Sequence, residues 1–290
     1  MANNTKKNKN NKGMLIGIAA GSLAVVGGLC GFLIYLQQPK KAAPEPVVET
    51  IETTERPTEK VAEFDPSKVK AGPVNGMRGM ERTLIEHYNA DTVGWIYIPD
   101  TDVDNPFVQS DDNAFYLDHG FDHEEFRAGT VFMDFRDNFG FDESTQSENI
   151  ILYGHNMANN TMFGSLRRYR QDLDFYKESP FIEIDSNYQH YTYVMFALPI
   201  TDGSADATWR YWDMEELDTK EEFDEYVETA RQKSLTDIPV DVKFGDKLLT
   251  LSTCYSDEDD SRFLVIARRV RPDETAESFQ KLFAQEEQGD

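Results

Sequence analysis

The chain has 290 residues, of which 39% are hydrophobic and 12% aromatic, so it has enough apolar side chains for the core of one or two domains. This composition excludes a wholly disordered chain, a collagen and a coiled coil. Acidic residues outnumber basic ones by 53 to 29, which gives a formal net charge of −24. A general nucleic-acid binder needs a basic face, so we expect no nucleic-acid partner.

The N-terminal segment has the pattern of a single membrane anchor. Residues 1–13 are polar and lysine-rich, and residues 14–36 then carry no charge. As a helix at about 1.5 Å per residue, this uncharged segment is roughly 34 Å long, which exceeds the roughly 30 Å of bilayer hydrocarbon. Because lysines precede the span, residues 1–13 should lie in the cytoplasm and the rest of the chain outside. We therefore predict a single-pass protein of the cell membrane.

A cleaved signal peptide is the main alternative to this anchor. The apolar run is longer than the roughly 7–15 residues usual for a signal peptide, and no clear cleavage site follows it. Cys30 resembles a lipoprotein cleavage cysteine, but Leu29 before it is large where such a site favours a small residue. An uncleaved anchor therefore fits the sequence better.

Residues 37–75 have the composition of an extracellular linker. Proline recurs there among Glu, Thr and Lys, and such a segment cannot bury enough apolar surface to fold. We expect the folded domain to run over 76–271. The remaining residues, 272–290, form a predicted acidic C-terminal tail with one loose helical turn around Phe279 and Phe283.

The predicted domain combines short β-like runs with a few helices. Runs rich in Val, Ile, Phe and Tyr predict strands over 93–98, 103–109, 129–134, 149–154, 181–185, 190–200, 247–253 and 262–270. Apolar residues at helical spacing predict helices over 77–89, 162–170, 173–177 and 218–233. About eight strands without βαβ alternation argue against a doubly wound sheet. They favour a mainly β barrel or sandwich, with an N-terminal helix and a helical insertion before the last two strands.

The predicted domain contains one cysteine, Cys254, because Cys30 lies in the predicted anchor. A lone thiol outside the cell is a packed bystander, half of an intermolecular disulfide or a reactive group. Cys254 ends a strand-like run and is followed at once by a polar loop, which gives the partial exposure that a reactive thiol needs. The next predicted strand begins at Arg262, so a hairpin brings Arg262 back beside Cys254.

Among the five histidines, His155 has the most suggestive position, because it directly follows a strand-like run that ends in Gly154. On local sequence alone, a solvated loop histidine is the simpler interpretation. Together with Cys254 and Arg262, however, His155 completes a set that supports acyl transfer. The thiolate attacks a peptide carbonyl, the imidazolium protonates the leaving amine, and the guanidinium stabilises the oxyanion or holds the carbonyl.

The segments that hold these three residues resemble those of the sortases, and specifically of class B. The run T-L-S-T-C at 250–254 matches the family's T-L-x-T-C signature, and Arg262 begins the next strand as the family's arginine does. Residues 151–157 match the segment around the family's histidine. Other stretches typical of class B lie at 106–109, 112–117 and 162–166, and the helices before the barrel and before the cysteine strand are class B features. The resemblance covers residues 77–271.

The resemblance implies an eight-stranded sortase β-barrel and a cysteine transpeptidase of Gram-positive bacteria. Such an enzyme cuts the C-terminal sorting signal of surface proteins after a Thr, keeps the acyl group on its cysteine, and passes it to an amine of a peptidoglycan precursor. Carried over residue by residue, Cys254 is the nucleophile, His155 the general acid/base and Arg262 the substrate or oxyanion clamp. Ser252 and Thr253 become substrate-binding residues. We expect no cofactor.

Two polar clusters have other interpretations that involve a metal. The acidic run 257–260 fits a solvated hairpin tip, a calcium site or a negative patch that attracts a cationic acceptor, although it lacks the spacing and glycine of an EF-hand. His119 and His123 would share a metal on a helix, but Gly120 between them favours a loop. We therefore predict no metal site.

Other activities and substrates stay open at this point. A cell-wall cysteine peptidase that only hydrolyses would use the same thioacyl intermediate, and a pilus-polymerising sortase would use a pilin lysine as acceptor. An extracellular binding domain that keeps the fold without the activity is disfavoured by the complete set of Cys254, His155 and Arg262. The sorting motif is also open, because many class B members have Tyr where Asn105 precedes Pro106.

Overall fold

The computed structural model describes residues 88–140, 142–186, 188–213, 217–255 and 260–286. The predicted tail, membrane anchor and linker at 1–75 lie outside these residues, as do nearly all of the predicted first helix and residues 257–259 of the acidic run. Within the described ranges, no helix has both the length and the hydrophobicity needed to cross a bilayer.

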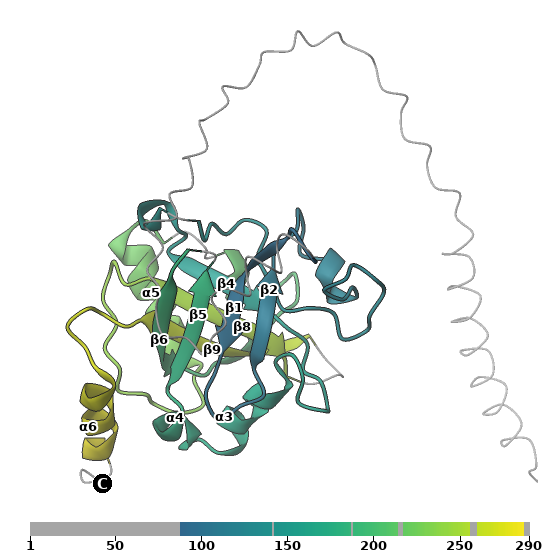
Figure 1. Ribbon diagram of the computed structural model, residues 1–290. Helices are drawn as coiled ribbons and strands as arrows, with labels where there is room; N and C mark the ends of the chain where they lie inside the picture. Colours follow the sequence, from purple (N-terminus) through teal and green to yellow (C-terminus); the bar gives the residue numbers. More distant parts are fainter. Residues whose placement is uncertain (1–87, 141, 187, 214–216, 256–259, 287–290) are drawn as a thin grey trace, which may run out of the picture. The chain divides into compact units, whose positions relative to one another are not determined.

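A closed β-barrel forms the centre of the described part (Figure 1). Its strands in chain order are β1 (Thr92–Tyr97), β2 (Asp104–Val108), β3 (Phe132–Met133), β4 (Asn149–Tyr153), β5 (Phe181–Ser186), β6 (His190–Ala197), β7 (Ile200–Asp202), β8 (Leu248–Cys254) and β9 (Ser261–Arg269). Hydrogen-bonded neighbours follow the order β6-β5-β1-β2-β3-β4-β8-β9, and a further pairing of β6 with β9 closes the ring. The predicted eight-stranded barrel is therefore confirmed, with β7 as a ninth, short strand on β9.

Most strand predictions match the structure to within one or two residues, and two differ more. The predicted strand over 190–200 is interrupted, because its register on β9 shifts after Met195, and β7 then continues along β9 in the same antiparallel direction. The predicted strand over 129–134 is only Phe132–Met133. Gly129 has a φ of +58° and lies against the carbonyl of Tyr116, so a turn replaces the start of that strand.

The strand registers bring the ends of β4, β8 and β9 together. Strands β4 and β8 run parallel, with Tyr153 opposite Ser252, and β8 and β9 run antiparallel, with Cys254 opposite Arg262. The residues that follow β4 and those that end β8 consequently lie at the same rim of the barrel. The predicted hairpin that returns Arg262 to Cys254 is confirmed by this register.

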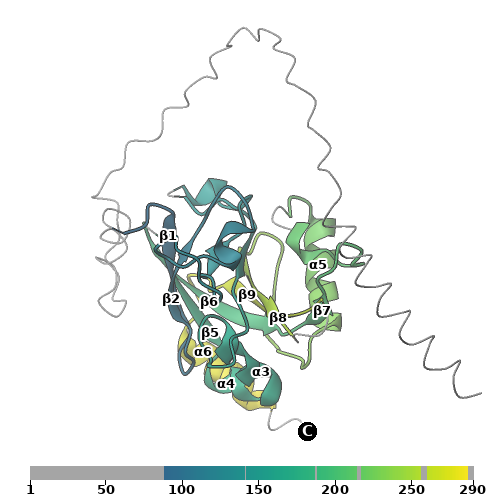
Figure 2. The ribbon, with the colours of Figure 1, turned by 90° about the vertical axis from the view of Figure 1, so that its right-hand side faces the viewer.

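Helices cover two parts of the barrel surface. They are the 3₁₀ turns η2 (Phe115–Leu117), η3 (Glu143–Thr145), η4 (Gly164–Arg167) and η5 (Tyr211–Asp213), and the α-helices α3 (Arg168–Gln171), α4 (Phe175–Glu178), α5 (Lys220–Gln232) and α6 (Ala276–Glu286). Figure 2 shows α3, α4 and α6 gathered at one end of the barrel, with α5 beside β7 and β8. The helix predicted over 218–233 is α5, which begins after a capping box at Thr219 and buries Phe223 and Tyr226.

The C-terminal segment is more ordered than the sequence predicted. Instead of one loose turn, residues 276–286 form α6, and Phe279 and Phe283 are only 4% and 3% exposed. The ring of Phe279 contacts Phe181 on β5, and that of Phe283 contacts Tyr176 on α4. The two phenylalanines lie four residues apart, so one face of the helix packs on the barrel while Glu277 stays exposed. The packed part of the chain thus extends past the predicted boundary at residue 271.

Candidate active site

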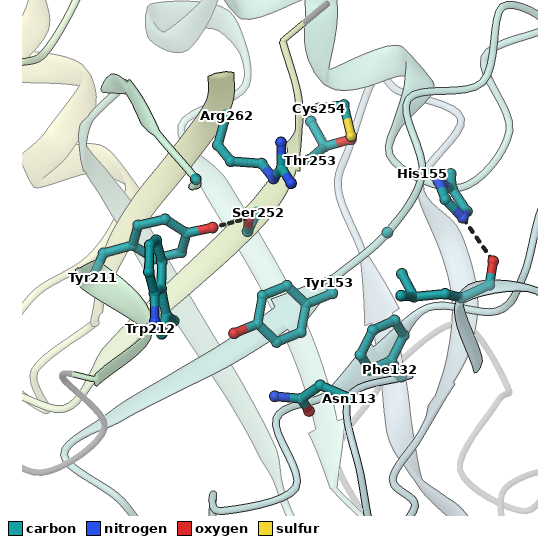
Figure 3. A pocket seen from close by; sticks show the side chains of 13 residues that line it. Asn113, Phe132, Tyr153, His155, Tyr211, Trp212, Ser252, Thr253, Cys254 and Arg262 are labelled. Atoms are coloured by element: carbon teal, nitrogen blue, oxygen red, sulfur yellow. Dashed lines mark hydrogen bonds between the residues drawn. The ribbon is translucent and has the colours of Figure 1, made fainter. Parts of the chain in front are cut away.

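The pocket at the barrel rim is lined by all five residues predicted for the site (Figure 3). Its volume is about 300 Å³, and its lining includes His155, Ser252, Thr253, Cys254 and Arg262. Cys254 is partly exposed at the end of β8 and forms no disulfide. This is the setting that the sequence predicted for a reactive thiol.

His155 lies just past the end of β4. The backbone N–H of Gly154 donates to the carbonyl of Ser252 at 3.2 Å, which continues the β4–β8 ladder to the residue before the histidine. A side chain at Gly154 would meet the ring of Phe163 at 2.7 Å, so only glycine allows this close packing. The Nε2 atom of His155 lies 2.7 Å from the carbonyl oxygen of Leu117. Because a carbonyl only accepts, this contact requires the proton on Nε2.

Arg262 reaches the pocket from β9. Its NH1 group donates to the backbone carbonyls of Asp260 at 2.9 Å and Ser261 at 3.3 Å. Gly203 leaves room for this side chain, because a Cβ atom there would lie 2.7 Å from the Cγ of Arg262. Within the part of the chain that the structure describes, no hydrogen bond occupies Nε or NH2, so both remain available to a ligand.

Ser252 and Thr253 differ in what their hydroxyl groups can do. The hydroxyl of Ser252 is 2.7 Å from the phenol oxygen of Tyr211 and is buried, so it already has a partner. The Oγ1 atom of Thr253 is also buried but has no hydrogen-bond partner among the described residues. Thr253 lines the pocket, but its hydroxyl oxygen has almost no accessible surface.

The sequence analysis missed most of the pocket's aromatic wall. Phe132, Tyr153, Tyr211 and Trp212 line the pocket together with Asn113 (Figure 3). Burial raises the pKa of Tyr211, against a smaller lowering effect of the hydrogen bond with Ser252 and of the charge of Arg262, so this phenol stays neutral. The aromatic run at 209–212 was the available signal, since three of its four residues are Trp or Tyr.

The buried carboxylate of Asp134 holds two side chains of this wall in place. Asp134 is fully buried and accepts from Asn113 Nδ2 at 2.8 Å, from the Tyr153 hydroxyl at 2.9 Å and from Arg136 Nε at 2.9 Å. Burial alone would raise the pKa of Asp134, but these hydrogen bonds outweigh it and hold the pKa below its usual value. The pKa of Tyr153 is raised, first by burial and then by the charge of Asp134. The ionised carboxylate of Asp134 therefore fixes Asn113 and Tyr153 in the pocket wall through hydrogen bonds.

Asn156 links the histidine loop to the cysteine strand. Its Nδ2 group donates to the backbone carbonyl of Cys254 at 2.9 Å, and its Oδ1 atom accepts from Arg167 at 3.1 Å. Arg167 also donates to the carbonyls of Met157 and of Gly164 in the same loop. The backbone beside His155 is thus tied directly to the backbone carbonyl of Cys254.

The two histidines considered as metal ligands bind different partners. His119 contacts Asp118 Oδ1 at 2.7 Å and stacks on Phe115, whereas His123 Nε2 is 2.9 Å from the hydroxyl of Tyr116. The described ranges contain no cluster of three or more His, Cys, Asp or Glu residues that could hold a metal ion.

Comparisons with known proteins agree with this geometry. A model of the sortase domain matches residues 96–270, which include His155, Cys254 and Arg262. Sortase B of Listeria monocytogenes is 36% identical over 186 residues, which are 64% of this chain and 72% of that protein. Sortase B of Staphylococcus aureus is 32% identical over 190 residues, 64% of this chain and 73% of that protein. A solved S. aureus sortase B–substrate complex gives a TM-score of 0.59 at 30% identity and covers 67% of this chain and 86% of that one.

Proposed function

Because the chain belongs to the class B sortases, which are cysteine transpeptidases, we propose that it joins proteins bearing a C-terminal sorting signal to a peptidoglycan amine. In this proposal residues 14–36 anchor the enzyme in the cell membrane and the barrel works outside the cell. The scissile bond follows a Thr of the sorting signal. The observation that carries the proposal is the single pocket that joins Cys254, His155 and Arg262 on three neighbouring elements.

The proposed reaction begins with acylation of the cysteine. Cys254 attacks as the thiolate: its Sγ bonds to the carbonyl carbon of the Thr, and the new C–S bond replaces the C–N bond to the following residue. His155 gives a proton to the leaving amine. Arg262 uses its free N–H groups to hold the carbonyl oxygen as negative charge develops on it.

The pocket lining fits the acyl part of such a substrate. Tyr153, Tyr211 and Trp212 present rings to the apolar parts of an extended peptide, and Thr253 lines the pocket beside Cys254. Ser252 contributes by fixing Tyr211 through their 2.7 Å contact. We therefore place the sorting peptide along this wall, with its Thr carbonyl at Cys254.

The test is the mass of the intact protein after reaction with sorting peptides. The full-length protein is incubated with a small library of Thr-containing pentapeptides extended at both ends, with and without an amine acceptor. We expect a thioacyl adduct that is absent in Cys254→Ala and that the acceptor converts to an amide product. An adduct that discharges only to the free acid, with every amine offered, would identify a peptidase instead. No adduct with any peptide, despite a folded protein and a thiol that reacts with iodoacetamide, would contradict the proposal.

A further inference from the structure

A second cavity opens beside the first and shares its reactive residues. It has a volume of about 670 Å³ and is bounded by Leu117, His155 and Cys254, as the first pocket is. The rest of its lining differs, because it includes the charged residues Asp118 and Arg127 in place of the aromatic wall. The thiol and the imidazole thus stand at the boundary between two cavities of different chemistry.

The chemistry of acyl transfer assigns different roles to the two cavities. In a reaction through a thioacyl enzyme, one amine leaves the acyl carbon and another attacks it. By microscopic reversibility both amines approach the same side of that carbon and exchange protons with the same imidazole. The acyl part stays in the first pocket, so the amine side must lie beyond Cys254 and His155. The second cavity occupies that position.

The charges in the second cavity match those of an amino acid or a short peptide. Asp118 bonds His119 through Oδ1, but its side chain is 74% exposed and can still attract a cation. Arg127 is exposed, and none of the residues that the structure describes forms an ion pair or hydrogen bond with its guanidinium. An acceptor with a free amino group carries a positive charge until it reacts, and a carboxylate elsewhere on it carries a negative one. Asp118 offers a negative charge to the ammonium group, and Arg127 offers a positive charge to the carboxylate.

We propose that this second cavity binds the amine acceptor, with Arg127 recognising a carboxylate of the acceptor and Asp118 attracting its ammonium group. The inference rests on the proposed transpeptidase function and adds the acceptor's chemical class, a short amino-terminated peptide with a free carboxylate. The ammonium group first gives one proton to the solvent. In the transfer step the neutral amine nitrogen then bonds to the acyl carbon, the bond from that carbon to Sγ breaks, and His155 takes a second proton from nitrogen. The products are an amide and the free cysteine, so atoms and electrons balance.

The test measures how the thioacyl enzyme divides between two products. The full-length protein reacts with one sorting peptide and with either triglycine or triglycine amide, which differ only in the terminal carboxylate. The ratio of amide product to hydrolysed product is set after acylation, so a change in the acylation rate does not alter it. Arg127→Ala should lower this ratio about fivefold with triglycine and leave it unchanged with triglycine amide. Asp118→Asn should lower it with both acceptors.

The control is Lys220→Ala, which removes one positive charge from an exposed position on α5. It should leave the ratio unchanged with both acceptors, which separates a local contact from an effect of net charge. Equal ratios for Arg127→Ala and the parent enzyme with triglycine would overturn the assignment of the cavity. An equal loss with both acceptors would overturn the role of Arg127 as a carboxylate contact. Absence of the thioacyl adduct itself would instead show that the proposed function fails.

Discussion

Arg262 has to make two kinds of contact at once in the proposed reaction. Its NH1 group holds the backbone carbonyls of Asp260 and Ser261, which fixes the start of β9. Its remaining N–H groups are then left for the substrate. A planar guanidinium with five donors can do both, whereas an ammonium group is a single point charge on a flexible stem.

Arg262→Lys should therefore keep the charge and lose most of the activity. We expect kcat for thioacyl formation to fall about 100-fold, because the loss of one oriented donor to an oxyanion costs about that much. The measurement is single-turnover acylation followed by mass, with the melting temperature as a check on folding. A lysine variant within threefold of the parent rate would show that charge alone suffices.

Asn156 is expected to act on the rate through the position of His155 and Cys254. Asn156→Asp keeps the shape of the side chain but replaces the donor to the Cys254 carbonyl by an oxygen, which repels that carbonyl. We expect kcat to fall about tenfold or more while KM changes little, since small displacements of reacting groups are costly. Steady-state kinetics provide the test.

Asn159→Ala is the matched control for this variant. Asn159 is in the same loop and is exposed, and among the residues that the structure describes it bonds to Thr161 alone. Its loss should leave kcat within twofold of the parent value. If both variants lower kcat equally, general loosening of the loop, rather than the link to Cys254, would explain the effect.

At the scale of secondary-structure elements, the local pattern was a good guide where it was strong. The run at 248–254 and helix α5 were predicted nearly to the residue, because each has a clear apolar period and distinct ends. The length of helix α6 was underestimated, since its apolar face has few residues. That face is buried by contacts with Phe181 and Tyr176, which lie on elements far away in the sequence. Local sequence does not report such partners.

For the candidate site as well, local sequence predicts some of the positions and not others. The positions of Cys254 and Arg262 follow from a hairpin, which the sequence between them predicts. The proximity of His155 to them depends on the parallel pairing of β4 with β8, and only the family resemblance could indicate it. Tyr211 reaches the pocket from a connection 41 residues away from its partner Ser252, and no local pattern predicts that contact.

Helix α6 should contribute to the stability of the barrel although it lies beyond the strands. Phe279→Ala removes a buried ring that packs on Phe181, and such a truncation costs about 3 kcal/mol or more. Urea unfolding measures this loss of free energy. The control is Gln280→Ala at the next, exposed position, which should change the free energy of unfolding by less than about 0.5 kcal/mol. Equal effects of the two variants would show that α6 does not pack on the barrel in solution.

For the molecule as a whole, a cluster of paired charges makes stability depend on pH. Arg268 is fully buried and bonds Glu274 at 2.6 Å, while Arg271 bonds Asp241 and Asp246. Partial burial raises the pKa of Asp241, but hydrogen bonds from Lys243 and Arg271 outweigh it and lower the pKa from 3.8 to about 2. The pKa of Glu274 is lowered as well: burial would raise it, but the hydrogen bonds and positive charges of Arg268 and Arg271 together outweigh that effect.

These lowered values predict which pH range weakens the fold. A carboxyl group whose pKa is depressed in the folded state stabilises that state fully above its unfolded pKa, and the stabilisation is lost as pH falls through the folded pKa. For Asp241 that loss occurs between roughly pH 5 and pH 2. We therefore expect the urea midpoint to fall over this range, and Asp241→Asn to make the fall shallower. Asp237→Asn, at a side chain that is 89% exposed, should reproduce the parent curve. A parent curve that stays level down to pH 2.5 would contradict the role of this cluster.

Pairing of strand β9 completes the barrel and the candidate active site at the same time. It pairs with β8 on one side and β6 on the other, so the ring stays open until Ser261–Arg269 have been made. The contact between Asn156 and Cys254 spans 98 residues of sequence, and closure of so long a segment is slow. Barrel closure and placement of Cys254 beside Arg262 are thus one event. A chain that is still being synthesised has no assembled pocket, so the proposed acylation cannot begin on it.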